Sequence, residues 1–294
     1  MIVFVVRGRR VGEALAMPVP LLYESHSHTT LCKHAQGTVS DYAAAAERRG
    51  LKGLIVTCHC PLPDGISSEV RMAPDQFDTY VDLVAAAREA YAGRVDVRLG
   101  LESDFFPGIE PWLEKLHARN PLHHVLGSVH MQVFHYRQKY WTGDPFAYQQ
   151  TYFQHLAEAA ETRLFDTLAH PDLVKNEDPS AWQFDRIRPF IERALDRIAA
   201  TGVAMELNTS GLLKSLPEMN PGRSILELMH ARGIPVVLGA DAHRPERVGD
   251  RYAGAMRILQ SVGYRDIHLF LERKRQTVSI ADALVSLGES PGTA

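Results

Sequence analysis

Histidines and carboxylates in this sequence fall where short apolar runs end. The first such run leads into Glu24-Ser25-His26-Ser27-His28, and a later one leads into Asp241-Ala242-His243. Residues two apart on an extended strand point to the same side, so both imidazoles of the His-x-His pair can reach one cation. A single His-x-His pair is a weak signal for a metal site. Its meaning therefore depends on what the other strand ends carry.

Five further apolar runs end in a residue that can bind a metal or form a hydrogen bond: His59, Glu102, His130, His170 and Asn208. Each histidine taken alone has a simpler interpretation, a core imidazole hydrogen-bonded to the backbone. A carboxylate at the end of a buried run, however, must be paired or coordinated to offset its desolvation. The joint pattern favours a ligand cluster.

With His34, on the loop after His28, the candidate ligands are seven histidines and two carboxylates: His26, His28, His34, His59, Glu102, His130, His170, Asp241 and His243. This set suffices for two or three divalent cations rather than one tetrahedral zinc. Mixed imidazole and carboxylate ligation suits Zn, Fe or Mn. Clustered cations lower the pKa of water and stabilise a leaving oxygen, which is the chemistry of phosphate-ester hydrolysis. Taken alone, Asp241 could instead cap the following helix.

The elements that must position these residues alternate along the chain, which indicates an α/β fold with a largely parallel sheet. We expect seven strands, near 20–26, 53–59, 95–102, 124–130, 165–170, 203–208 and 234–240. Helices are expected at 38–50, 75–91, 146–163, 184–200 and 221–233, and a strand-like run at 267–271 and a helix near 281–287 complete the domain. In parallel barrels the loops after the strands build the active site, so these strand ends should meet.

Composition is that of an ordinary globular protein, with 294 residues, 45% hydrophobic and 23% charged. The net charge of -3 offers no general electrostatic attraction to nucleic acid. Small anionic substrates are still compatible with it, because a metal cluster carries its own positive charge. Cys32, Cys58 and Cys60 form no even-numbered disulfide framework, and a reducing cytoplasm fits best.

The chain start resembles neither a signal peptide nor a membrane span. We interpret 1–17 as an extension or misassigned start, and 18–294 as one domain. Oligomeric state is not readable.

Cationic side chains near the expected strand ends are candidates for binding phosphate. Lys175, Arg244 and Arg247 lie just beyond strands that carry candidate ligands, and Arg137 and Lys139 lie in the loop after His130. Each of them, taken alone, is more simply a solvated surface charge. Seven further histidines lie away from strand ends and are left unassigned: His117, His123, His124, His135, His155, His230 and His268.

At the level of motifs, the sequence resembles the PHP (polymerase and histidinol phosphatase) family, particularly its histidinol-phosphate phosphatases. The matching segments, between about Leu22 and Gly249, are HSHTTLCKHA at 26–35, GLKGLIVTCH at 50–59, GLES at 100–103, GSVH at 127–130, AHPDLVK at 169–175, ELNTSGL at 206–212 and GADAHRPERVG at 239–249. Two positions depart from the family pattern. Glu24 stands where Asp is usual, and Cys58 replaces the usual Asp before His59.

The resemblance implies a distorted seven-stranded (β/α)7 TIM-like barrel with a trinuclear metal centre. It implies that one metal is held by His26, His28, Glu102 and Asp241, a second by Glu102, His130 and His170, and a third by His34, His59 and His243. Catalytic roles are expected for Asp241, His243 and Glu102. Contacts to substrate or phosphate are expected from Lys175, Arg244, Arg137, Asn208 and Ser128.

The activity that the resemblance implies is hydrolysis of L-histidinol phosphate to L-histidinol and phosphate in histidine biosynthesis. A phosphoesterase acting on another small phosphate ester or on nucleotides is the first alternative. The second is a non-catalytic module whose metals are structural, although structural sites are usually closed and made of four ligands.

Overall fold

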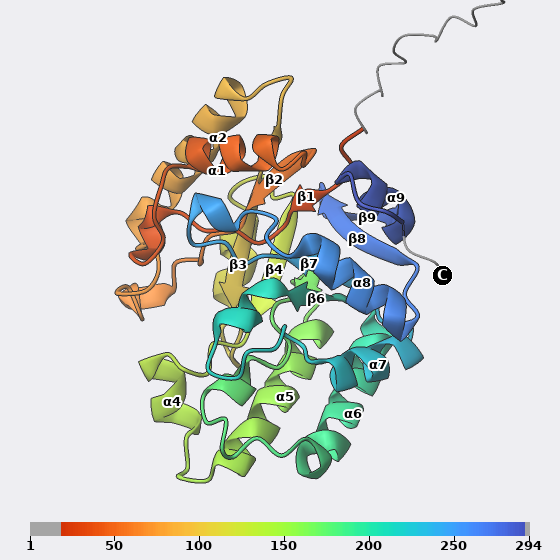
Figure 1. Ribbon diagram of the computed structural model, residues 1–294. Coiled ribbons are helices and arrows are strands. Elements are labelled where there is room, and N and C mark those ends of the chain that lie inside the picture. Colours follow the sequence, from red (N-terminus) through yellow and green to blue (C-terminus); the bar gives the residue numbers. More distant parts are fainter. Residues whose placement is uncertain (1–18, 292–294) are drawn as a thin grey trace, which may run out of the picture.

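The computed structural model describes residues 19–291 (Figure 1). One sheet contains all the named strands, and they are hydrogen-bonded in chain order from β1 to β9. The strands are β1 (Tyr23–Glu24), β2 (Gly53–Val56), β3 (Asp96–Asp104), β4 (His124–Ser128), β5 (Thr167–Leu168), β6 (Ala204–Asn208), β7 (Val236–Gly239), β8 (Asp266–Leu271) and β9 (Lys274–Ser279). Neighbours pair in parallel from β1 through β8, and β9 returns antiparallel to β8.

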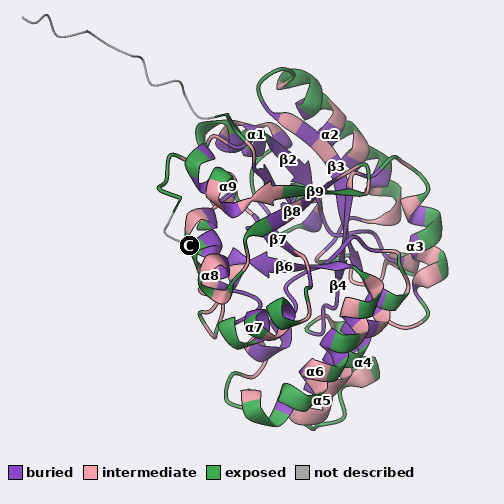
Figure 2. Ribbon diagram, turned by 90° about the vertical axis from the view of Figure 1, so that its right-hand side faces the viewer, coloured by how far each residue is buried: buried purple, intermediate pink, exposed green. Residues whose placement is uncertain are grey.

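Helices connect the parallel strands and surround the sheet. Strands β1 to β7 are largely buried, while the helices expose their outer faces (Figure 2). They are α1 (Val39–Arg48), α2 (Phe77–Ala90), α3 (Glu110–His117), α4 (Phe134–Tyr140), α5 (Pro145–Glu161), α6 (Phe184–Thr201), α7 (Arg223–Ala231), α8 (Tyr252–Val262) and α9 (Ile280–Ser286). The expected α/β class with a mostly parallel sheet is confirmed.

Local sequence explains where these helices begin and end. Thr38 caps α1 by accepting a bond from the Asp41 amide, and the Asp41 carboxylate accepts one from the Thr38 amide in return, a capping box. At the carboxyl end of α6, Gly202 adopts a φ of 76°, a left-handed conformation that glycine takes without steric cost. Buried Ile187, Ile191 and Ile198 give α6 its apolar face.

Our count of seven strands was too low, because the sheet contains nine. The extra strands form the β8–β9 hairpin. The first of them, β8, confirms the strand-like run expected at 267–271, whereas β9 was not expected and is mostly exposed. Its polar sequence, KRQTVS, carries no apolar alternation that would have predicted a strand. The helices α3, α4 and α8 were also not expected.

The β8–β9 hairpin lies against the amino-terminal ends of the other strands. Phe270 of β8 stacks on the His124 ring at the start of β4, with centroids 5.3 Å apart. The Arg273 amide donates to the carbonyl of His123 at 3.0 Å, and its side chain pairs with Asp166 at 2.6 Å. This end of the sheet is therefore covered, and access to the strands lies at their carboxyl ends.

Just past the carboxyl ends, the chain continues to pair. Ser27 bridges Ala242 in parallel fashion, which links the segments that follow β1 and β7, and His59 bridges Glu102. Residues 1–17, interpreted as an extension or misassigned start, lie outside the described residues. No helix in the described range is long and apolar enough to cross a membrane.

Candidate metal centre

The carboxyl ends of the strands bring all nine candidate ligands to one place. His26 and His28 follow β1, His59 follows β2, and Glu102 lies within β3. His130 follows β4, His170 follows β5, and Asp241 and His243 follow β7, while His34 comes from the loop before α1. His26 and Glu102 are fully buried, whereas His34 is exposed and His243 is half-buried.

Glu102 lies at the centre of the cluster, and its two carboxylate oxygens face different histidines. Oε2 lies 2.7 Å from Nδ1 of His59 and 3.5 Å from Nε2 of His26. Oε1 lies 3.1 Å from Nε2 of His170 and 3.3 Å from Nε2 of His130. A carboxylate placed in this way can contribute one oxygen to each of two cations.

Asp241 approaches the cluster from the opposite side. Its Oδ1 lies 3.1 Å from Nε2 of His28, 3.7 Å from Nε2 of His26 and 3.3 Å from Nδ1 of His243. Ser210 donates to the other oxygen at 2.9 Å. Asp241 and His170 adopt positive φ values of 49° and 30°, which are unusual for residues other than glycine and are often found at functional sites.

His34 and His243 form the outer edge of the cluster. Their Nε2 atoms lie 2.9 Å apart, and the His243 ring stacks between those of His34 and His28, with centroid distances of 4.6 and 3.9 Å. The His59 ring lies 5.4 Å from that of His34. Imidazole nitrogens from three segments thus converge on one region beside Glu102.

Unsatisfied polar atoms at the centre test whether this donor set fits cations. Among the described residues, none forms a hydrogen bond with Nε2 of His26, Nδ1 of His59 or Oε2 of Glu102, although all three atoms are buried. The short approach of His59 to Glu102 therefore lacks hydrogen-bond geometry. Buried polar groups are almost always satisfied. Converging nitrogen and oxygen atoms without partners are what divalent metal ligation requires, so the residues fit.

Carboxylates behind the ligands orient two of the imidazoles. Glu206 lies 2.7 Å from Nδ1 of His26 and accepts a bond from the His170 amide at 2.8 Å. Asp104 lies 3.0 Å from Nδ1 of His130. In both cases the other nitrogen, Nε2, faces Glu102. Such partners hold a metal-binding histidine in one tautomer and orientation.

Our sequence reasoning missed Glu206 and Asp104. A usable signal existed, because Asp104 lies two residues after Glu102 on β3 and Glu206 lies two residues before Asn208 on β6. Residues two apart on a strand share a face. A second buried carboxylate on the same face as a candidate ligand was therefore readable as its supporting group.

Electrostatics within the cluster depend on the balance of burial and opposite charge. Burial opposes ionisation, but the imidazoles of His59, His26 and His130 hold the pKa of Glu102 well below its usual range. For His130, burial is outweighed by Asp104 and Glu102, which raise its pKa to about 10. Metal ligands must be deprotonated, so cation binding displaces this proton and is weakened by acid.

Beside the cluster lies a cavity of about 380 Å³. Five of the histidine ligands and both carboxylate ligands line it, together with Lys214 and Arg244. We call it the metal cavity. Arg244, a candidate phosphate contact, is thus placed at the cavity. Lys214 was not singled out from the sequence, because it lies six residues beyond Asn208, the end of β6, with no motif to mark it.

The other candidate substrate contacts lie elsewhere. Lys175 is fully buried and pairs with Asp172 at 2.8 Å and Glu218 at 3.0 Å, and Arg137 pairs with Glu177. Ser128 donates to Oε1 of Glu102 at 2.5 Å. Asn208 donates to Glu206 at 3.0 Å and accepts from the Ser210 amide. None of these four lines the metal cavity.

The two departures from the family pattern lie behind the ligands. Glu24 is fully buried and accepts bonds from the amides of His26, Ala240 and Gly249, and burial raises its pKa to about 7. Cys58 is also buried, and its sulfur accepts a bond from the Thr29 hydroxyl at 3.2 Å. Both residues therefore support the backbone that carries the first two histidines.

Comparison with known proteins gives a consistent result. The PHP domain family model matches residues 24–210. A probable histidinol-phosphatase of Deinococcus radiodurans is 38% identical over 264 residues, covering 87% of this chain and 98% of that protein. The histidinol-phosphatase of Bacillus subtilis is 25% identical over 78% of this chain and 96% of that protein.

Among solved structures, the fold is similar to that of histidinol phosphate phosphatase from Lactococcus lactis, determined with Zn, L-histidinol and phosphate. The TM-score is 0.71 at 16% identity, and the alignment covers 87% of this chain and 98% of that one. A histidinol phosphatase structure from Listeria monocytogenes gives a TM-score of 0.69 at 20% identity, covering 79% and 99%.

Proposed function

This chain belongs to the PHP domain family, as its motifs predicted, and we propose that it is a metal-dependent phosphomonoesterase that hydrolyses L-histidinol phosphate to L-histidinol and phosphate. The observation that carries the proposal is the convergence of seven imidazoles and two carboxylates beside the metal cavity, which Lys214 and Arg244 also line. Similarity to a histidinol-phosphatase relative over nearly the whole chain supports the choice of substrate.

Two or three divalent cations, Zn, Fe or Mn, would be held by the nine ligands, with Glu102 shared between two of them. Its oxygens face separate groups of histidines, which supports this arrangement. The contact of Asp241 with His28 supports placing Asp241 with His26, His28 and Glu102 around one cation. The contact of His34 with His243 supports a third group of ligands. When bound, the cations supply activated water and neutralise charge on the phosphate.

The protein's own groups bind and orient the phosphate beside that centre. Lys214 and Arg244 are the cationic side chains that line the metal cavity, and positive charge there stabilises the charge that develops on the phosphate oxygens. Asp241 is a carboxylate that lines the same cavity, and we propose that it exchanges the proton needed by the leaving alcohol. Glu102 and His243 hold the reaction centre in place.

The fold supports a finer proposal as well. We propose that β1 to β7 form a distorted seven-stranded barrel within one domain, residues 18–294. The bridge between Ser27 and Ala242 supports this, because it links the segments after the first and the seventh strand. The β8–β9 hairpin then covers the amino-terminal end of that barrel.

The test is phosphate release from L-histidinol phosphate and from a panel of other monoesters and nucleotides, with added Mn or Zn and with chelator. We expect a strong preference for L-histidinol phosphate that chelator abolishes and metal restores. Metal-dependent hydrolysis of other esters alone would retain the site and reject the substrate. Metal binding without hydrolysis of any ester would favour a structural centre.

A further inference from the structure

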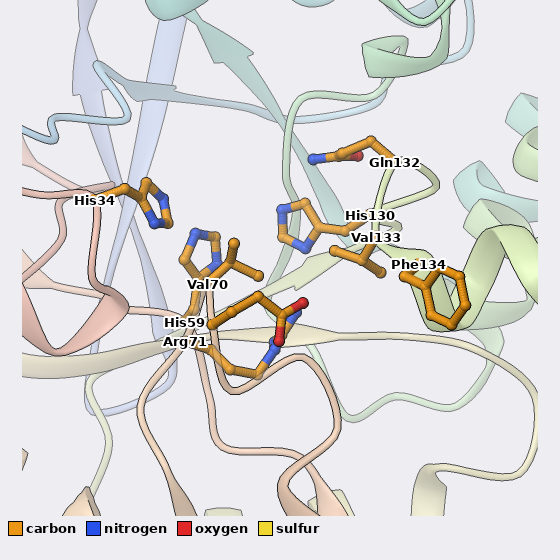
Figure 3. A pocket seen from close by; sticks show the side chains of 9 residues that line it. His34, His59, Val70, Arg71, His130, Gln132, Val133 and Phe134 are labelled. Atoms are coloured by element: carbon orange, nitrogen blue, oxygen red, sulfur yellow. The ribbon is translucent and has the colours of Figure 1, made fainter.

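A second cavity, of about 280 Å³, adjoins the metal cavity. The two share the side chains of His34, His59, His130 and Gln132. The remaining wall of the second cavity comes from two loops, and its residues are Glu69, Val70, Arg71, Val133 and Phe134. We call this space the loop-side cavity. Figure 3 shows that the His34, His59 and His130 rings lie on one side of it and Phe134 on the other.

The two cavities differ in the charged side chains that line them in addition to the candidate metal ligands. The metal cavity has the cations Lys214 and Arg244 on its wall, whereas the loop-side cavity has the exposed carboxylate of Glu69. Arg71 also lines this cavity, but its guanidinium donates to both oxygens of Asp104 at 2.9 and 2.7 Å. Arg71 is therefore committed to Asp104 and leaves the charge of Glu69 available to a ligand.

The segment that carries Glu69 is anchored close to the metal ligands. Arg71 is 1% exposed, and its partner Asp104 also holds His130 at 3.0 Å. Lys33 donates to the Arg71 carbonyl at 2.9 Å and to Gln76 at 2.9 Å. These hydrogen bonds connect the backbone next to Glu69 both to Asp104, behind His130, and to Lys33, beside His34. They therefore hold Glu69 at the cavity.

The opposite wall offers an aromatic surface. Phe134, at the start of α4, lines this cavity and is 73% exposed, so its ring is accessible to a ligand there. Val133 lies beside it, and Val70 lines the cavity on the side of His59 (Figure 3). An aromatic ring next to an apolar wall favours a flat ring in stacked or edge-on contact.

We propose that the loop-side cavity binds the alcohol part of the phosphate ester, and that it selects alcohols that carry a positive charge and a planar ring. Glu69 faces the charge and Phe134 faces the ring, while the phosphate lies in the metal cavity. This inference rests on the proposed function, because L-histidinol has both an ammonium group and an imidazole. It adds two specificity-determining residues outside the metal ligands.

Steady-state kinetics of metal-loaded enzyme test the charge. Neutralising Glu69 by Glu69→Gln should raise KM for L-histidinol phosphate about tenfold, as expected for a lost charge-assisted contact, with kcat little changed. KM for phenyl phosphate, which has a ring and no cation, should stay within about twofold. Glu69→Asp should retain most of the preference. Phe134→Ala should raise KM for both substrates.

Asp64→Asn is the matched control. Asp64 is an exposed acid on the same segment and does not line the loop-side cavity, and its φ of 56° is a conformation that Asn also accepts. This variant should leave both KM values unchanged. Equal effects of Glu69→Gln on both substrates, or none on either, would overturn the proposal.

A second substrate pair separates this inference from the proposed function. If the wild-type enzyme fails to hydrolyse L-histidinol phosphate, the proposed function is wrong. O-phosphoethanolamine and propyl phosphate then decide the inference, because they differ in an ammonium group. A preference for O-phosphoethanolamine that Glu69→Gln removes supports a subsite for cations. No preference in the wild-type enzyme rejects it.

Discussion

Asp104 contacts His130 at 3.0 Å through Nδ1 of the ring, and this contact turns the other nitrogen toward Glu102, 3.3 Å away. Asp104 is itself held by the buried guanidinium of Arg71. Burial opposes ionisation of Asp104, but Arg71 and His130 hold its pKa below its usual range. A chain of contacts therefore runs from the loop before α2 to the metal centre.

Replacing Asp104 by Asn should weaken metal binding by about 10- to 100-fold, because the amide no longer fixes the His130 ring as an anion does. Competition between the protein and a chelating dye measures this affinity. Asp96→Asn is the control, since Asp96 lies on the same strand and pairs with Arg98 at 2.6 Å at the other end. Equal metal affinity in the Asp104 variant and wild type would contradict the assigned role.

Removing a ligand should abolish turnover while the fold persists. We expect Asp241→Asn and His130→Ala to lower kcat/KM by about 10³-fold or more, measured at saturating metal. Asn is preferred to Ala at position 241 because the φ of 49° suits Asn. Circular dichroism and the thermal midpoint report the fold. Turnover near that of the wild type in either metal-saturated variant would refute the site.

Lys175 should contribute to stability rather than to phosphate binding. It is fully buried between Asp172 and Glu218, and removing one partner of a buried pair leaves an uncompensated charge. Lys175→Met should therefore reduce the free energy of unfolding in urea by about 3–5 kcal/mol. The exposed Lys139 provides the control, Lys139→Met, with a change below about 0.5 kcal/mol. A similarly small change in Lys175→Met would show that this pair is not needed.

Stability should fall in acid partly because of His124. Burial lowers its pKa from 6.5 to about 3, with further lowering from His26 and Arg273. Between these two values the unfolded chain binds a proton that the folded chain does not, so stability decreases as the pH falls from 6.5 toward 3. The loss from this group approaches about 1.4 kcal/mol per pH unit.

The variant His124→Gln should flatten this dependence, since glutamine does not titrate. Urea unfolding at several pH values between 7 and 5 measures the slope for both proteins. His135→Gln, on a half-buried residue of α4, is the comparison and should keep the wild-type slope. An unchanged slope in His124→Gln would mean that other groups govern the acid limb.

The fold class and the nine candidate ligands could be predicted from the amino-acid sequence. Eight of these ligands follow or end a buried apolar run, and His34 lies on the loop after His28. Parallel strands place their carboxyl ends at one edge of a sheet. The residue types then limit the chemistry, because imidazoles and carboxylates gathered at one edge suit divalent metals. Family membership followed from the same short segments around those strand ends.

Which charged side chains line the site could not be predicted from the sequence, because it depends on contacts between distant segments. The sequence singled out Lys175 as a phosphate contact and did not single out Lys214, yet Lys175 is buried against Glu218, 43 residues away, while Lys214 lines the metal cavity. The same holds for Arg71, whose partner Asp104 lies 33 residues away. Periodicity reports which face of an element is buried, but it does not report which distant loop supplies a partner. Such pairings depend on how the loops pack across the strand ends.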